Sequence, residues 1–165
     1  MQTYVIVGGV AGGATAATRL RRLNENAHII VIERGPYVSF ANCGLPYHIG
    51  GTIDERENLL VATPETLEKG FEIDVRTRQE VERVDPDARS VRIRNLETDE
   101  IYELSYTKLL LSPGAKPFVP PIPGVELDGI YSLRTIPDMD RIISRMDETA
   151  VQDVVVVGGG FIGLE

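Results

Sequence analysis

Two glycine-rich turns, each directly after a run of β-branched residues, constrain the fold of this chain more than any other feature. The sequence YVIV at 4–7 runs into Gly8–Gly13, and VVVV at 154–157 runs into Gly158–Gly163. Continuous apolar runs of this kind are typical of strands buried on both faces of a parallel sheet. A glycine turn between such a strand and a helix lets the backbone approach a dinucleotide pyrophosphate. The sequence therefore predicts an α/β protein with two dinucleotide-binding turns.

The first turn opens a complete strand–helix–strand unit. Residues 14–24 are predicted to be helical, and HIIVIE at 28–33 is a second apolar run. Glu33 ends this run, where a carboxylate can accept hydrogen bonds from both hydroxyls of a ribose. Val10 stands where the G-x-G-x-x-G pattern has its middle glycine. The predicted dinucleotide site consists of Glu33 and the turn residues Gly8, Val10, Ala11, Gly12 and Gly13.

The second turn matches the same pattern at Gly158, Gly160 and Gly163. Two such turns in one chain indicate two dinucleotides, and the usual physical use of that pair is electron transfer between a nicotinamide and a flavin. Only Leu164 and Glu165 follow the second turn, although a dinucleotide fold needs a full βαβ unit there. We therefore expect the chain to be an N-terminal fragment.

The rest of the chain predicts further elements and one domain boundary. Five prolines between 113 and 124 indicate a stiff connector. We expect an incomplete first nucleotide-binding domain at 1–115, then the connector and the start of a second domain at 116–165. The other predicted elements are a helix at 64–70 closed by Gly70, an antiparallel meander within 73–106, a buried strand at 108–112, a helix near 137–148 and a strand at 153–157.

Composition excludes several other classes of protein. The formal net charge is −8, which argues against nucleic acid or an anionic membrane as the main partner. No apolar run approaches the roughly 20 residues of a membrane-spanning helix, and no cationic region precedes the apolar start. A single cysteine excludes an internal disulfide framework, fits a cytoplasmic protein and, with only two histidines, leaves little for a metal site.

The segment around Cys43 carries the most specific signal. The sequences VGGVAGG, VIERGPYVSFANCGLPY, LLLSPGAKP and VVVVGGGFIGLE resemble, in order, the single-cysteine branch of the flavin-dependent pyridine nucleotide–disulfide oxidoreductases. The resemblance implies FAD in the first domain, NADH or NADPH in the second, and a homodimeric parent enzyme. It also implies coenzyme A disulfide, or a related small disulfide, as the substrate.

The same resemblance implies that Cys43 is the redox nucleophile. Dithiol members have a second cysteine five positions away, whereas Val38 and His48 occupy those positions here. Cys43 would therefore alternate between a thiolate and a mixed disulfide with a small thiol. We expect it in the first turn of a short helix after the capping residue Asn42, a position that favours the thiolate.

The first helix predicts an anion-binding stripe. Thr15, Arg19 and Arg22 are spaced i, i+4 and i+7 on the face opposite Ala16, Ala17, Leu20 and Leu23. Two arginines and a hydroxyl suit phosphates, although a solvated basic face has the same pattern. In the resembled enzymes the matching positions contact coenzyme A, together with those of Ser39 and Asn42.

The resemblance assigns other residues more weakly. It implies backbone contacts with the flavin nucleotide at Val81, Ser112 and Gly114, and Arg34 lies either over the adenine or in water. Peroxide- and oxygen-reducing relatives carry a histidine where this chain has Ala11, which disfavours a dedicated peroxidase or water-forming oxidase. The alternatives that remain are NADH oxidase activity, persulfide or polysulfide reduction, and an inactive dinucleotide-binding module.

Overall fold

The structure is a computed structural model that describes residues 2–149 and 151–164, and these form two compact units. The first unit comprises the residues up to Phe40 together with Leu60–Gly114. The second comprises Ala41–Leu59 together with the residues from Ala115 onward. The first glycine turn therefore lies in the first unit, and both Cys43 and the second glycine turn lie in the second.

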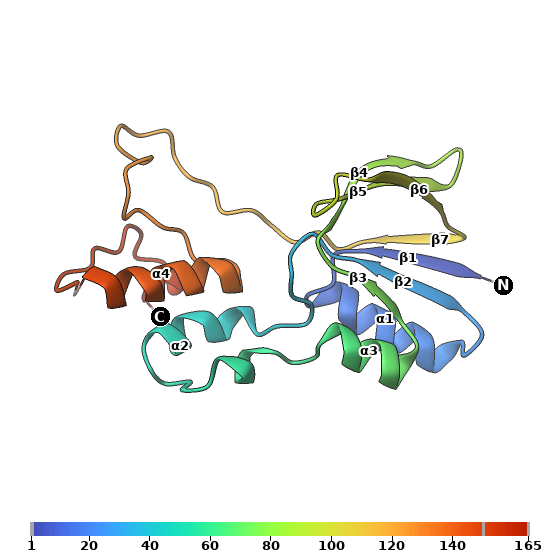
Figure 1. The fold of residues 1–165 in the computed structure, drawn as a ribbon, viewed down its shortest axis with the longest axis horizontal. Coiled ribbons are helices and arrows are strands. Elements are labelled where there is room, and N and C mark those ends of the chain that lie inside the picture. Colours follow the sequence, from blue (N-terminus) through green and yellow to red (C-terminus); the bar gives the residue numbers. More distant parts are fainter. Residues whose placement is uncertain (1, 150, 165) are drawn as a thin grey trace. The chain divides into compact units, whose positions relative to one another are not determined.

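The centre of the first unit is a parallel sheet of four strands in the order β3-β2-β1-β7 (Figure 1). Its strands are β1 (Thr3–Val7), β2 (His28–Ile32), β3 (Asp74–Arg76) and β7 (Lys108–Leu111). Helix α1 (Gly12–Leu23) connects β1 to β2, and helix α3 (Pro64–Phe71) precedes β3. The βαβ unit that the first glycine turn predicts is confirmed.

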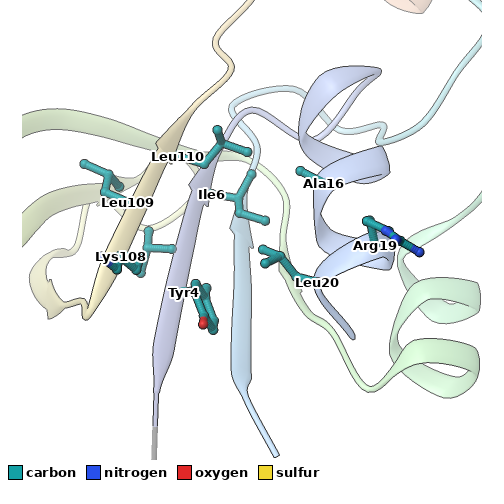
Figure 2. Close-up of a pocket in the computed structure, with 9 residues that line it drawn as sticks. Tyr4, Ile6, Ala16, Arg19, Leu20, Lys108, Leu109 and Leu110 are labelled. Carbon is teal, nitrogen blue, oxygen red and sulfur yellow. The ribbon is translucent and has the colours of Figure 1, made fainter. Parts of the chain in front are cut away.

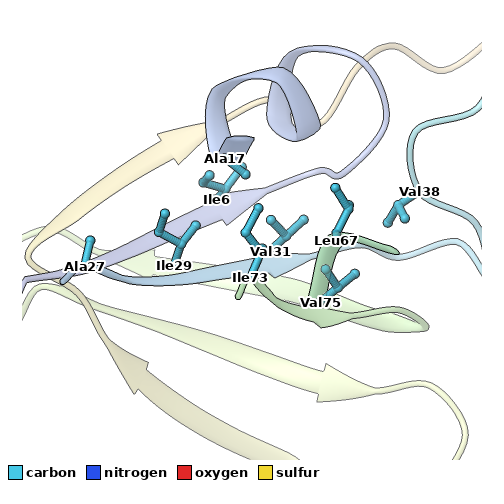
Figure 3. Close-up of a cluster of buried hydrophobic side chains, with 9 residues drawn as sticks. All are labelled: Ile6, Ala17, Ala27, Ile29, Val31, Val38, Leu67, Ile73 and Val75. Carbon is cyan, nitrogen blue, oxygen red and sulfur yellow. The ribbon is translucent and has the colours of Figure 1, made fainter. Parts of the chain in front are cut away.

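Apolar side chains cover both faces of this sheet. On the helix side, Ile6, Ile29 and Val31 pack with Ala17 of α1 and Leu67 of α3 (Figure 3). On the other side, β1 and β2 pack against an antiparallel sheet of β4 (Gln79–Asp85), β5 (Ser90–Asn95) and β6 (Ile101–Ser105). Burial on both faces explains why the strands of the parallel sheet are continuous apolar runs. The predicted α/β class, a parallel sheet plus an antiparallel meander, is confirmed.

Two local predictions for the first unit were wrong. Residues 74–76 pair with β2 in the parallel sheet, so the antiparallel meander begins only at Gln79. Helix α3 continues through Gly70 and ends at Phe71, because Glu72 takes the left-handed conformation that terminates it. Leu23 is 67% exposed, because α1 buries mainly Gly13, Ala14 and Ala17.

Strand β7 is an open edge of the sheet, not the buried strand that its sequence predicts. Leu111 is 58% exposed, because no described strand lies beyond β7. On the helix side, a groove of about 380 Å³ runs between β7, β1 and the outer face of α1 (Figure 2). Its lining is mainly apolar, with Arg19 and Lys108 as the charged members.

Arg21 joins the C-terminal ends of α1 and α3. Its guanidinium donates hydrogen bonds to the carbonyl oxygens of Phe71 and Glu72, at 2.8 and 2.7 Å, at the C-terminal end of α3. It also donates to the carbonyls of Asn24, Glu25 and Ala27 after α1. These carbonyls have no intrahelical partner, so one side chain satisfies the ends of both helices.

The second unit is built around the segment that contains Cys43. Its elements are the 3₁₀ turns η1 (Asn42–Gly44) and η2 (Arg56–Leu59) and the helices α2 (Leu45–Ile49), α4 (Ile136–Thr149) and α5 (Phe161–Leu164). Leu45, Leu59, Ile136 and Met139 are fully buried. Arg56 donates two hydrogen bonds to the carboxylate of Asp140, at 2.9 and 2.8 Å, and so ties η2 to α4.

The strand predicted at 153–157 was wrong. No strand is present in the described residues 151–160, and Val154–Val157 are between 62% and 90% exposed. A strand exists only where a neighbour pairs with its backbone, and no described residue does so here.

Candidate functional site

The first glycine turn holds α1 unusually close to the ends of β1 and β7. Gly8 has a φ of +93°, and a Cβ on it would lie 2.1 Å from the carbonyl oxygen of Ser112. A Cβ on Gly13 would lie 1.7 Å from the carbonyl oxygen of Gly8. A Cβ on Gly12 would lie 2.6 Å from Oγ of Ser112. Backbone contacts within the chain therefore require glycine at Gly8 and Gly13, whereas a Cβ at Gly12 would displace only the Ser112 side chain.

The first turn of α1 leaves backbone N–H groups available to an anion. Ala11 precedes the helix, and its methyl group cannot accept a hydrogen bond from them. The first turn contains no acidic side chain either. The N-terminal end of the helix dipole attracts negative charge, and this end meets the carboxyl ends of the parallel strands. Together with the half-buried Val10, the turn forms a concave backbone surface suited to a pyrophosphate.

Glu33 follows β2, and its carboxylate is fixed by two backbone groups. Oε2 accepts a hydrogen bond from the Gly9 N–H at 2.8 Å, and Oε1 accepts one from the Gly35 N–H at 2.7 Å. Each carboxylate oxygen can accept more than one hydrogen bond, so both retain capacity for a hydroxyl. The paired hydroxyls of a ribose match this arrangement. Sequence reasoning missed the roles of Gly9 and Gly35, because a backbone donor has no residue signature.

Two further predicted residues, Ser39 and Ser112, contact the same turn. Ser39 has a φ of +46°, and its N–H donates to the carbonyl of Gly9 at 3.0 Å. Ser112 contacts the turn as described above, and its N–H donates to the carbonyl of Val7 at 2.8 Å. Gly114 has a φ of +71° two residues later. The structure therefore brings Ser39 and Ser112 to the glycine turn.

Val81 and Arg34 have structural partners of their own. Val81 packs against the apolar cluster between the two sheets, next to a bulge in β4. Arg34 is 71% exposed and forms an ion pair with Glu80 at 3.3 Å. Their contacts with a nucleotide stay predictions.

The second glycine turn repeats the geometry of the first. Gly158 has a φ of +116°, and a Cβ on Gly163 would lie 2.0 Å from the carbonyl oxygen of Gly158. The residues that correspond in the first turn are Gly8 and Gly13, with the same close approach. Around Gly158 and Gly160, a Cβ would meet nothing within 4 Å. The two turns are therefore the same local structure, and the second has open space around it.

Cys43 is exposed at the centre of η1, which leads directly into α2. The expectation that Asn42 caps this segment was wrong: Asn42 is the first residue of η1, and the extended Ala41 precedes it. The backbone of Gly44 packs closely against the buried Leu59 side chain, so that a Cβ on Gly44 would lie 2.8 Å from it. This contact anchors the segment. Nδ1 of His48 donates to the carbonyl of Ile53 at 2.6 Å, which gives this histidine a local structural role on α2. An exposed thiol on an anchored turn is accessible to a disulfide in solution.

The cationic stripe on α1 is exposed over its whole length. Thr15, Arg19 and Arg22 are all solvent-accessible. Within residues 2–149 and 151–164, neither Arg19 nor Arg22 pairs with an acidic side chain, in contrast to Arg21 with its carbonyl partners. Their guanidinium groups are therefore available to an anionic ligand.

The described residues offer neither a metal site nor a membrane-spanning helix. They contain no group of three or more His, Cys, Asp or Glu side chains placed to hold a metal ion. None of their helices has the length and apolarity that crossing a membrane requires.

Comparison with known proteins places these features in a family. Residues 2–165 match the pyridine nucleotide-disulphide oxidoreductase family. The chain is 40% identical to coenzyme A disulfide reductase of Staphylococcus haemolyticus over 165 residues, which are 100% of this chain and 37% of that protein. The chain thus spans little more than a third of the length of this relative.

Two solved structures have nearly the same fold. The reduced CoADR-RHD of Bacillus anthracis has a TM-score of 0.97 and 51% identity, over 99% of this chain and 29% of that one. An NAD-dependent persulfide reductase from A. fulgidus has a TM-score of 0.94 and 37% identity, over 99% of this chain and 31% of that one.

The chain therefore belongs to the pyridine nucleotide-disulphide oxidoreductases, a family of enzymes that bind FAD and NAD(P)H. The first unit fits the adenosine diphosphate portion of FAD. Close backbone packing fixes its glycine turn, its helix presents free N–H groups, and Glu33 presents two carboxylate oxygens. Gly8, Val10, Ala11, Gly12 and Gly13 would hold the pyrophosphate, and Glu33 the ribose.

Replacing Gly13 with alanine tests the close approach. We expect Gly13→Ala to lower the melting temperature and the fraction of protein that retains flavin, because its Cβ must displace the Gly8 carbonyl. The loss of stability should be about 2–3 kcal/mol, as for overpacked sites. Thermal unfolding and the flavin absorbance per polypeptide measure both effects.

The matched control is Gly70→Ala in α3, where a Cβ meets nothing within 4 Å. This variant should be as stable as the parent or more stable by up to about 1 kcal/mol. Equal melting temperatures and equal flavin contents in Gly13→Ala and Gly70→Ala would contradict the proposed role of the glycine turn.

Proposed function

We propose that this protein is an FAD-dependent NAD(P)H:disulfide oxidoreductase, with coenzyme A disulfide as the most suitable substrate. The observation that carries the proposal is the exposed Cys43, the sole cysteine of the chain, on the anchored turn η1 of a family member. Relatives named coenzyme A disulfide reductase, 40–41% identical over the whole chain, support this substrate.

Cys43 performs the covalent step. Its thiolate attacks one sulfur of the substrate, a new S–S bond forms to Cys43, and the other sulfur leaves as a thiolate. Two electrons and two protons then restore the Cys43 thiolate, release the second thiol and protonate the first. FAD, when bound, passes these electrons from NAD(P)H. The overall reaction consumes one disulfide, one NAD(P)H and one proton, and yields two thiols and NAD(P)⁺.

Other residues bind the reactants. Glu33 and the first glycine turn orient FAD, with backbone contacts from Ser112, Gly114 and Val81 and a contact of Arg34 near the adenine. Gly158, Gly160 and Gly163 bind the pyrophosphate of NAD(P)H, supported by the geometry that they share with the first turn. Thr15, Arg19, Arg22, Ser39 and Asn42 bind coenzyme A, whose phosphates suit the unpaired guanidinium groups.

A persulfide is the second candidate substrate. The structural neighbour from A. fulgidus is an NAD-dependent persulfide reductase, and the same thiolate could attack a persulfide sulfur. The two substrates differ in their need for phosphate recognition, so the cationic stripe separates them.

Replacing Cys43 with serine tests the nucleophile. We expect Cys43→Ser to lower the rate of NAD(P)H-dependent coenzyme A disulfide reduction by about 10³-fold or more, because a hydroxyl cannot form the mixed disulfide. The FAD content should not change, since the FAD site lies in residues of the first unit. Thiol release and flavin absorbance are the measurements.

A positive observation on the unmodified protein accompanies this test. Reaction with coenzyme A disulfide without NAD(P)H should attach coenzyme A to Cys43, and peptide mass spectrometry detects this adduct. Normal turnover by the serine variant would refute Cys43 as the nucleophile.

The double variant Arg19→Ala/Arg22→Ala tests the stripe. We expect KM for coenzyme A disulfide to rise about 10- to 100-fold, because each of the two lost contacts is worth about 0.5–1.5 kcal/mol at an exposed site and about 1.4 kcal/mol is a factor of ten. KM for NAD(P)H should change less than about twofold, because the proposed site of that cofactor is the second glycine turn and does not include Arg19 or Arg22. Steady-state kinetics with each substrate varied in turn gives both values.

The control Lys69→Ala/Arg83→Ala removes two exposed cations from the same unit, so its net charge equals that of the Arg19→Ala/Arg22→Ala variant. It should leave both KM values near those of the parent. If the stripe variant raises the two KM values equally, or the control raises KM for coenzyme A disulfide as much, the stripe is not a coenzyme A site.

A further inference from the structure

A polar network lies beside Glu33 that the proposed reaction does not use. The guanidinium of Arg76 at the end of β3 makes hydrogen bonds to both carboxylate oxygens of Asp74, the shortest from Nη2 at 2.7 Å. Nη1 of Arg76 donates to the hydroxyl of Tyr102 at 2.9 Å, and that hydroxyl donates to Oε1 of Gln79. The network therefore links β3 to β6 of the other sheet and returns to the first residue of β4.

The members of this network have defined charges and limited exposure. The side chains of Arg76 and Asp74 are 27% and 33% exposed. The guanidinium also lies 5.7 Å from the centre of the Tyr102 ring, within the range of a cation–π contact. The hydrogen bonds that Arg76 donates to Asp74, and then the one to Tyr102, hold the pKa of Arg76 above its ordinary value despite its burial. Arg76 is thus a permanent cation in a fixed position.

The two ends of the network are also the backbone partners of Glu33. The Glu33 N–H donates to the carbonyl of Arg76 at 2.8 Å, and the Gln79 N–H donates to the carbonyl of Glu33 at 3.1 Å. Between them, the N–H of Arg78 donates to the carbonyl of Gly35 at 3.1 Å. The corner 76–79 therefore holds the backbone of Glu33 on both sides and reaches Gly35, which donates to the Glu33 carboxylate.

The corner itself is strained and needs support. Arg78 has a φ of +54°, a left-handed conformation that disfavours side chains other than glycine. Such a conformation persists only where the surrounding structure fixes it. The side chains of Arg76, Gln79 and Tyr102 contribute to that constraint, because they join the two ends of the corner through one phenol oxygen.

We propose that Arg76, Gln79 and Tyr102 are positioning residues that set the Glu33 carboxylate for the ribose of the bound dinucleotide. This inference rests on the proposed role of Glu33 in the FAD site. Loss of the Tyr102 hydroxyl leaves Nη1 of Arg76 and Oε1 of Gln79 unpaired at the ends of the corner, and the backbone of Glu33 moves with them.

The test measures the affinity of the apoprotein for FAD by flavin fluorescence, after the flavin is removed from the purified protein. We expect Tyr102→Phe to raise Kd about tenfold, comparable to the loss of an outer hydrogen-bond partner at a ligand site. Gln79→Met should act similarly, whereas Gln79→Glu keeps an acceptor for the phenol and should retain an affinity close to that of the parent. The control is Tyr106→Phe, which removes a hydroxyl from a tyrosine packed against the same apolar cluster.

A double-mutant cycle separates positioning from simple support of the fold. Glu33→Gln alone should raise Kd at least tenfold, and adding Tyr102→Phe should then raise it less than twofold further, because the two changes act through one carboxylate. Fully additive effects, or an unchanged Kd in both Tyr102→Phe and Gln79→Met, would overturn the positioning role. An unchanged Kd in Glu33→Gln would instead refute the assignment of Glu33 to the cofactor.

Discussion

The Gly8 carbonyl oxygen and the Cα of Gly13 lie so close together that a single methyl group would stand 1.7 Å from that oxygen. This approach joins the end of β1 to the start of α1 and brings the helix N-terminus to the carboxyl edge of the sheet. Ser112 closes the turn from β7, and Glu33 closes it from β2 through the N–H of Gly9. Three neighbouring parallel strands thus converge on one turn, which is where open α/β sheets bind ligands. Everything that we infer about the cofactor depends on this convergence.

The two units divide the proposed chemistry between them. In the first unit, burial on both sheet faces and the corner 76–79 fix the backbone around the proposed cofactor site. They hold the Glu33 carboxylate and the N–H groups at the start of α1 in place. The second unit carries the exposed thiol of Cys43 on a turn anchored by Gly44 against Leu59. Binding thus relies on preorganised backbone, while covalent chemistry relies on one accessible side chain. The two glycine turns share one local geometry, which supports the proposal that each binds a dinucleotide.

Local sequence patterns predicted those parts of the fold that depend on residues close together in the sequence. The βαβ unit, both glycine turns and the position of Glu33 at a strand end follow from periodicity and glycine spacing. Predictions failed where distant partners decide the outcome. Asp74–Arg76 joins the parallel sheet because β2 offers a free edge, β7 is exposed because no described strand lies beyond it, and 153–157 is not a strand because no described residue pairs with it. The network of Arg76, Gln79 and Tyr102 joins three strands, and no spacing along the chain reveals it.

A crystal structure of the protein with FAD is the most direct measurement of how the cofactor binds. We expect pyrophosphate oxygens at the N–H groups that open α1, and ribose hydroxyls about 2.5–3.0 Å from the Glu33 carboxylate oxygens, as for ordinary O–H···O bonds. Glu33 should keep its hydrogen bonds from Gly9 and Gly35. A flavin nucleotide bound away from the Gly8–Gly13 turn, or a ribose with no contact to Glu33, would contradict the proposed cofactor site.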